Sequence, residues 1–141
     1  MRNIKKFVRK AYWQALNDTI VYKGANVPCY DTFAPDNASF PYILITNQTQ
    51  ADDKDNQDYN YITTITLDVV TAGIAPYGRL DADSIADSIL QLVCLYPENY
   101  LTMDIGKIVT AKLVQQSSLS SITDTNIVHR EILTIENWID G

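Results

Sequence analysis

The side chains best able to do chemistry are few and lie far apart in the sequence. His129, the only histidine, stands beside Arg130 and Glu131 in a β-rich segment, and we expect it to be an exposed strand residue. A hydrolytic triad needs a serine, a histidine and an acid brought together, and no local pattern marks a nucleophile. Cys29 and Cys94 stand alone without a CxxC pair, which is typical of reduced thiols that are buried or half-buried. These residues predict no catalytic site.

An acidic segment offers a different chemistry, calcium binding. Residues 51–58 read ADDKDNQD and contain four aspartates, Asp52, Asp53, Asp55 and Asp58. Carboxylate oxygens suit Ca²⁺, but an EF-hand register from Asp53 puts Asp58 where glycine is needed and Thr64 where the bidentate glutamate belongs. We therefore expect a solvated loop that binds no specific metal ion and that either stays extended or complements a basic surface on a partner.

Motifs for sugar-nucleotide or nucleotide binding are not supported by the sequence. Asp81-Ala82-Asp83 resembles the DxD of some sugar transferases, but it lies where a helix should begin. Negative charge is stabilised at a helix N-terminus, so we expect Asp81 or Asp83 to cap that helix. Neither GxGxxG nor GxxxxGK[ST] occurs, so no nucleotide site is predicted. We expect no catalytic residue, cofactor or metal, and hence a protein that is not an enzyme.

Charge is distributed unevenly along the 141 residues. The formal net charge is −6, yet the first ten residues hold five of the eleven basic side chains, Arg2, Lys5, Lys6, Arg9 and Lys10. The other 131 residues carry six basic and seventeen acidic side chains, which gives −11. A body this acidic would repel phosphate, so sequence-specific nucleic-acid binding is not expected. The asymmetry favours head-to-tail association, in which the basic end of one copy meets the acidic body of another.

The basic residues belong to a predicted amphipathic helix over residues 3–17. Its apolar side chains recur with helical spacing, and the opposite face carries Arg2, Lys5, Lys6 and Arg9 with Trp13 at its centre. A large aromatic side chain in that position loses hydrophobic free energy unless another surface packs on it. Arginine with tryptophan is a common anchor pair at interfaces. The cover is either a neighbouring protein with an acidic surface or the chain's own loop. We take this face as a candidate interface.

The remaining elements follow from periodicity and turn residues. We expect a hairpin turning at Gly24, a loop over 31–41, a second helix that starts near residue 81 and is stopped by Pro97, and strands near 42–48, 59–72, 105–116 and 126–139. The order is α-β-β-β-β-α-β-β. This predicts a single α+β domain over residues 1–141, a mostly antiparallel sheet with the N-terminal helix and one central helix packed on it. The side chains expected to bury between helices and sheet are Phe7, Val8, Ala11, Tyr12, Ile85, Ile89, Leu92 and Val93.

Two of these strands are too long for the body. A compact chain of this length has a diameter of about 37 Å, whereas a 14-residue strand runs about 46 Å. Overlong strands that protrude can pair with a neighbouring subunit. The connection 117–125 is expected to be a polar hairpin loop, in which the apolar Leu119 and Ile122 are candidate contacts with another subunit.

Two features of the segment order are distinctive: the expected strand Phe40-Pro41-Tyr42-Ile43-Leu44-Ile45, and the spacing from the strand at 61–70 to the helix at 83–90. In these features the chain resembles the tail terminator (tail completion) family of tailed phages, whose LPYVV segment is similar to the first of them. A final β hairpin ends near an aromatic residue, Trp138. The serine-rich loop and the basic first helix depart from the family pattern. The resemblance covers nearly the whole chain.

The resemblance implies a structural protein without catalysis or a cofactor. It implies a ring of copies, with a hexamer favoured and a dodecamer possible, that meets the tail tube and the head connector in the virion after assembly in the host cytoplasm. Two alternatives remain open: a head–tail adaptor or collar protein of another ring order, and a non-viral protein-binding adaptor module. No apolar run is long enough to span a membrane and no secretory signal is evident, so no membrane partner is expected.

Overall fold

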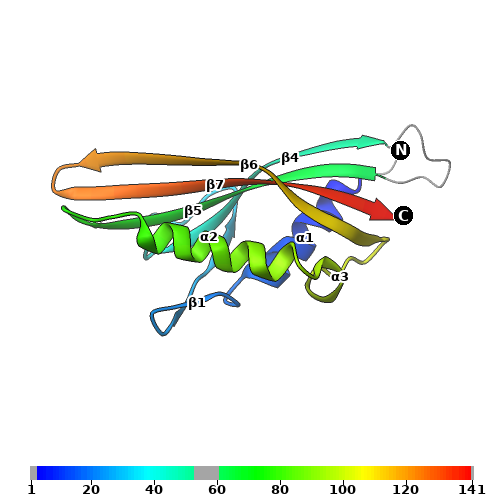
Figure 1. The fold of residues 1–141 in the computed structure, drawn as a ribbon, viewed down its shortest axis with the longest axis horizontal. Coiled ribbons are helices and arrows are strands. Elements are labelled where there is room, and N and C mark those ends of the chain that lie inside the picture. The colour runs from blue at the N-terminus through cyan, green and yellow to red at the C-terminus, as the bar shows by residue number, and fades with distance from the viewer. Residues whose placement is uncertain (1–2, 53–60, 141) are drawn as a thin grey trace.

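The computed structural model describes residues 3–52 and 61–140, and its elements follow one long sheet (Figure 1). In chain order they are α1 (Lys5–Leu16), β1 (Val21–Tyr22), β2 (Ala25–Asn26), β3 (Cys29–Asp31), β4 (Tyr42–Asp52), β5 (Tyr61–Ile74), α2 (Leu80–Val93), α3 (Pro97–Tyr100), β6 (Lys107–Thr123) and β7 (Asn126–Asp140). The predicted α+β class is confirmed, and β3 and α3 are short additions to the expected order. No helix in the described residues is long and apolar enough to cross a membrane.

The main sheet has five strands in the order β3-β4-β5-β7-β6. Neighbours are antiparallel except β3 and β4, which run parallel over three residue pairs. The β5–β7 ladder is continuous from Tyr61↔Ile139 to Ile74↔Asn126, so these central strands span the whole length of the sheet. A register shift lies between Ile45 and Asn47 in β4, and two more lie in β6. The mostly antiparallel pairing confirms the sequence-based prediction.

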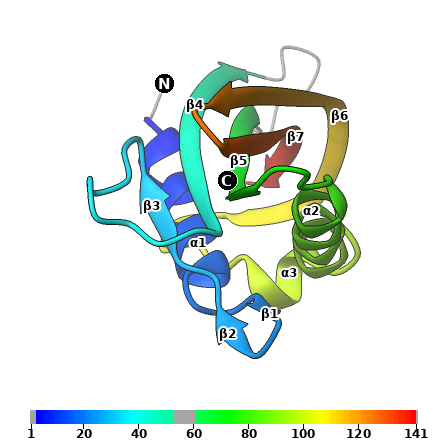
Figure 2. The same cartoon turned by 90° about the vertical axis from the view of Figure 1, so that its left-hand side faces the viewer.

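Both long helices pack on the same face of this sheet, on opposite sides of the molecule when it is seen along its long axis (Figure 2). Six of the eight predicted contact residues are fully buried there: Val8, Ala11, Tyr12, Ile85, Ile89 and Val93. Phe7 and Leu92 are partly buried at the rim of the same core. Tyr12 also donates a hydrogen bond from Oη to Asn137 Oδ1 on β7 at 2.5 Å, which satisfies its buried hydroxyl. The core therefore lies where helical and strand periodicity placed it.

The opposite face of the sheet carries many threonines. Thr49 and Thr64 hydrogen bond across β4 and β5 at 2.6 Å, and Thr66 and Thr134 across β5 and β7 at 3.4 Å. Such cross-strand pairs each stabilise a sheet by about 0.2–1 kcal/mol. The long helices leave this face uncovered, although Asp68 and Val70 of β5 are buried on it.

The connection between the last two strands differs from the prediction. Residues 117–123 are not a loop but the end of β6, which pairs with β7 up to Thr123↔Asn126 and leaves a two-residue turn at Asp124-Thr125. Asp124 has a φ of 53°, a left-handed conformation that aspartate tolerates in tight turns. Serine-rich segments read as loops because their strand propensity is low, but pairing with a long neighbouring strand overrides local propensity.

Smaller predictions about turns and helix ends had mixed outcomes. The hairpin at Gly24 is confirmed, with Lys23 and Gly24 both at positive φ between β1 and β2. The expected capping role of Asp81 or Asp83 is wrong: α2 starts after Arg79 without a side-chain cap, and both aspartates lie in its first turn. The two cysteines are free, with Cys29 buried and Cys94 half-buried, as expected.

Candidate assembly surface

The end of the sheet beyond α2 is formed by the paired halves of β6 and β7 together with the end of β5. We call residues 115–134 the distal hairpin. It projects past the first residue of α2, so neither long helix covers its tip (Figure 1). β6 is an edge strand, and its residues 115–123 pair with β7 without a register shift and include no charged residue or proline. Natural edge strands usually carry charges, prolines or bulges that prevent pairing with other chains, and this part of the edge has none of them.

The two candidate contact residues lie on this edge strand. Leu119 is 52% exposed and Ile122 is 75% exposed. They face opposite sides of the sheet, because Leu119 pairs with Arg130 and Ile122 with Ile127 in one continuous register. Ile74, at the end of β5, adds a third exposed apolar side chain at this end of the molecule. The distal hairpin thus presents apolar side chains on both faces.

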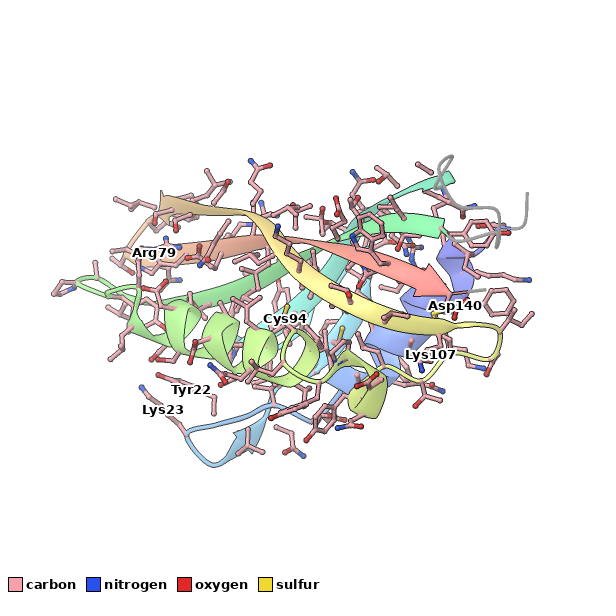
Figure 3. All side chains as sticks on the ribbon, turned by 45° about the vertical axis from the view of Figure 1, so that its right-hand side comes forward. Tyr22, Lys23, Arg79, Cys94, Lys107 and Asp140 are labelled. Carbon is pink, nitrogen blue, oxygen red and sulfur yellow. The ribbon has the colours of Figure 1, made fainter. Side chains whose placement is uncertain are left out.

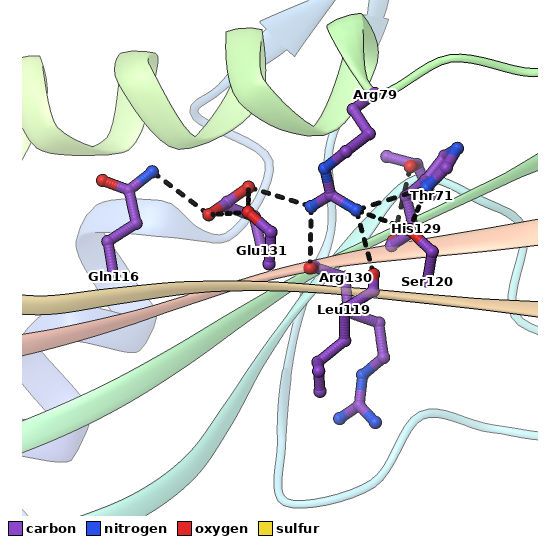
Figure 4. A network of polar contacts seen from close by, with 9 residues as sticks. Thr71, Arg79, Gln116, Leu119, Ser120, His129, Arg130 and Glu131 are labelled. Carbon is purple, nitrogen blue, oxygen red and sulfur yellow. Dashed lines mark hydrogen bonds and ion pairs between the residues drawn. The ribbon is translucent and has the colours of Figure 1, made fainter.

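A polar network around the buried Glu131 and His129 fixes the distal hairpin to the start of α2 (Figure 4). The guanidinium of Arg79 donates to the Glu131 carboxylate at 2.9 Å, to the Arg130 carbonyl at 2.9 Å and to the Leu119 carbonyl at 3.0 Å. It also donates to Ser120 Oγ at 2.8 Å. One side chain from the residue before α2 therefore holds both strands of the hairpin.

Glu131 is the negative centre of this network. Its side chain is only 1% exposed, and it accepts hydrogen bonds from Ser118 Oγ at 2.8 Å and from Gln116 Nε2 at 3.2 Å besides Arg79. Burial alone would raise the pKa of Glu131, but these donors lower it below its ordinary value. Asp83, close to Glu131, has its pKa raised by burial and by the neighbouring carboxylate. Glu131 is therefore the ionised partner of Arg79.

His129 belongs to the same network, which corrects the expectation of an exposed residue. It is buried, with Nδ1 2.7 Å from Ser120 Oγ and Nε2 2.6 Å from the Tyr77 carbonyl. Since a carbonyl only accepts, Nε2 carries a proton and donates, and Nδ1 accepts from Ser120. The imidazole joins the hairpin to the segment before α2. Ser120 is its hydroxyl neighbour, but the other ring nitrogen faces a backbone carbonyl and not a carboxylate, so these described residues do not form the serine–histidine–acid arrangement of a hydrolytic triad.

Sequence reasoning missed this network although a signal was present. Ser118 and Ser120 stand opposite Glu131 and His129 in the ladder, so four polar side chains occupy core-facing positions of two strands. Side chains alternate between the two faces along each strand, so this pairing can be predicted from the sequence. The prediction requires that the two strands be joined by the two-residue turn at Asp124-Thr125. Arg79 carries no local signal, because its role depends on where α2 begins in space.

An ion pair stabilises the hairpin on the other face of the sheet. Arg130 Nε donates to Asp68 Oδ2 of β5 at 2.8 Å, and Asp68 is buried. The hydrogen bond to this carboxylate raises the pKa of Arg130. The distal hairpin is therefore anchored by arginine on both faces, once to α2 and once to β5.

A second polar cluster joins the small β1–β2 hairpin to α2, and Figure 3 shows Tyr22 and Lys23 of that hairpin beside the first part of the helix. Asp81 accepts hydrogen bonds from the hydroxyls of Tyr22 and Tyr77, and Lys23 Nζ lies 3.4 Å from Asp81 Oδ1. The two tyrosine hydrogen bonds lower the pKa of Asp81, so the carboxylate stays ionised. The cluster borders a cavity of about 270 Å³ that also touches Phe40. Asp81, predicted as a cap, instead ties two elements together.

The basic helix face is placed as predicted, but it is partly covered by its own chain. Trp13 is 41% exposed, and its Nε1 donates to the Cys29 carbonyl of β3 at 2.8 Å. Arg9 Nη1 lies 3.3 Å from Asp31 Oδ1, also in β3. Lys5 is half-buried and Lys6 exposed. One edge of the indole is thus held by β3 of the same chain while the rest is exposed, and its cover by a neighbouring protein stays a prediction.

Several predicted residues lie outside the described structure. These are Arg2, Asp53, Asp55 and Asp58, while Asp52 ends strand β4. Across residues 3–52 and 61–140, no group of three histidine, cysteine or acidic side chains is placed to hold a metal ion. The metal-free reading of the acidic segment stays a prediction.

Comparison with known proteins bears on the fold. No family model matches the sequence, and a search of curated proteins finds no match. Among solved structures, the chain is similar to one from the "Virion of native gene transfer agent (GTA) particle", with a TM-score of 0.75 and 16% sequence identity. The similarity covers 100% of both chains. At this identity the likeness shows a shared fold over the whole length.

Proposed function

We propose that this protein is a structural component of a virion that assembles with copies of itself into a ring at the tail end or head–tail junction of a tailed phage. In this role it resembles the tail terminators. A hexamer is the favoured order, and the tail tube and head connector proteins are its neighbours. No catalytic step or cofactor is part of the proposal.

The observation that carries the proposal is the distal hairpin. It is a long, rigidly anchored extension with an unprotected edge strand and with exposed apolar side chains on both faces. Exposed apolar surface and free strand edges mark interaction sites, because a monomer gains nothing from holding them in water. Two arginines hold this extension at a defined angle, as docking onto a neighbour requires.

Two further findings support a virion role. The shared fold with a chain of a gene transfer agent virion extends over the full length of both chains. The segment 40–45, which leads into β4, and the spacing between β5 and α2 resemble the tail terminator pattern. These findings are independent of the distal hairpin and lead to the same class of protein.

The test compares assembly with stability in the same variants. Leu119→Ser combined with Ile122→Ser should abolish ring formation in sedimentation velocity while leaving the thermal unfolding midpoint nearly unchanged, because both side chains are exposed in the monomer. Val21→Ser is the matched control, since Val21 is 61% exposed on β1, far from the hairpin. Unchanged assembly of the double variant would remove the distal hairpin from the interface. The mass of the wild-type ring also gives its order.

A further inference from the structure

A groove lies between the first half of α1 and strand β4. It has a volume of about 430 Å³ and is lined by Asn3, Lys5, Lys6, Arg9, Thr46, Asn47 and Gln48. Three of its seven lining residues are cationic and none is acidic. The groove is therefore a concave, basic and hydrogen-bonding surface, unlike the apolar distal hairpin.

The walls of the groove are fixed by hydrogen bonds between the helix and the strand. Gln48 Nε2 donates to the Lys5 carbonyl at 3.0 Å, and the Ile4 amide donates to Gln50 Oε1 at 3.0 Å. The register shift in β4 between Ile45 and Asn47 occurs at the same place. A bulge bends a strand and re-aims its side chains, which places Thr46 and Asn47 at the wall. The shape of the groove is thus built by the fold.

Only one of its three cations is paired with an acidic side chain in the described part of the chain. Arg9 pairs with Asp31, but Arg9 Nε is buried without a hydrogen-bond partner among the described residues. Lys5 and Lys6 form no ion pair in that part of the chain, and the first turn of α1 contains no acidic residue. Cations in a first turn are unfavourable next to the positive end of the helix dipole. A bound anionic group would relieve this.

We propose that this groove receives acidic side chains from a second copy of the chain. The two surfaces are complementary in charge: outside the first ten residues the chain carries a net charge of −11, so each copy offers the carboxylates that the groove of another copy lacks. The same acidic body repels the phosphates of nucleic acid. The proposal rests on the proposed self-assembly and defines one of its contacts.

The contact has a consequence for symmetry. A basic groove and an acidic surface are different patches, so the interface between two copies is heterologous. Head-to-tail interfaces of this kind close into rings when the rotation between copies allows. The groove therefore makes the contact between copies directional, whereas the apolar distal hairpin contributes buried surface area to the interface.

Charge reversal gives the first test. Lys5→Glu combined with Lys6→Glu should raise the concentration needed for half-assembly by about tenfold or more, which corresponds to about 1.4 kcal/mol. Lys107→Glu combined with Lys112→Glu is the control, because it makes the same change in net charge at exposed positions of β6 outside the groove. Added salt should weaken wild-type assembly and have little effect on the groove variant.

Zero-length carbodiimide cross-linking of mixed isotope-labelled and unlabelled copies gives the second test. It should join Lys5 or Lys6 of one copy to a carboxylate of another, and the peptide identifies that carboxylate. The proposal is overturned if the groove variant assembles like wild type, or if cross-links occur only within a copy. It is also overturned if the variant loses binding to double-stranded DNA while assembly is unchanged. In these outcomes the wild-type ring still forms, whereas a wild type that never assembles would refute the proposed function itself.

Discussion

Under the helices, the core-facing positions of the sheet hold aliphatic side chains such as Leu67 and Ile135, whereas in the distal hairpin the same positions hold Ser120, His129 and Glu131. The helix-covered half is stabilised by burying apolar area that no partner has to supply. The distal half is stabilised by hydrogen bonds to Arg79 and keeps its apolar side chains exposed. One half of the sheet is thus a conventional core and the other a positioned extension, which can be perturbed separately.

The largest effect is expected in the helix-covered half. Ile89 is fully buried on α2, and Ile89→Ala should lower the free energy of unfolding by about 2–5 kcal/mol, because it removes buried methyl groups and leaves a cavity. Ile122→Ala in the distal hairpin should change it by about 0.5 kcal/mol or less. Urea unfolding followed by circular dichroism measures both. Equal losses for the two variants would contradict the division into two halves.

An intermediate and local effect is expected for Arg79. Arg79→Met leaves Glu131 buried with only Ser118 and Gln116 as donors, and should cost about 1–3 kcal/mol. Amide hydrogen exchange should speed up in residues 115–134 and stay unchanged in β4 and the middle of α2, because local opening follows local contacts. Lys112→Met, at an exposed position in β6, is the control. Uniformly faster exchange across the sheet would mean that Arg79 supports the whole fold.

The smallest effect is expected from Asp81, which lies at the boundary of the two halves. Hydrogen bonds from Tyr22 and Tyr77 lower its folded-state pKa. Its carboxylate therefore stabilises the fold at pH above its unfolded pKa of about 3.9, and this contribution is lost as the pH falls through the folded value. The difference in unfolding free energy between wild type and Asp81→Asn should be largest near neutral pH and shrink in acid. A difference independent of pH would show that Asp81 acts by packing and not by charge.

The same division explains what the sequence predicted. Val8, Tyr12, Ile85 and Ile89 repeat with a helical period, and apolar burial follows such a pattern directly, so the fold class and the core were predicted correctly. The distal end was predicted as a loop because its stability comes from Arg79, a residue about 40 to 50 positions away from its partners. Local propensity carries no information about a contact of that range. The basic residues Lys5, Lys6 and Arg9 were predicted as a candidate interface. The groove that they form with β4 was not predicted, because it depends on contacts between residues about 40 positions apart in the sequence.

Leu119 and Ile122 illustrate a partial prediction. Their apolar character in a polar segment identified them as candidate contacts, and they are exposed at the distal end. Their positions on opposite faces of one strand could not be foreseen while the segment was taken as a loop. Because the segment is a strand, we expect two contact patches, one on each face of the sheet.

Electron microscopy of the concentrated protein in negative stain tests the central claim most directly. We expect closed rings of uniform diameter for wild type, and single subunits for Leu119→Ser combined with Ile122→Ser under the same conditions. Wild-type particles that remain single subunits at every concentration, or rings that persist unchanged in the double variant, would contradict the claim that the distal hairpin builds a ring.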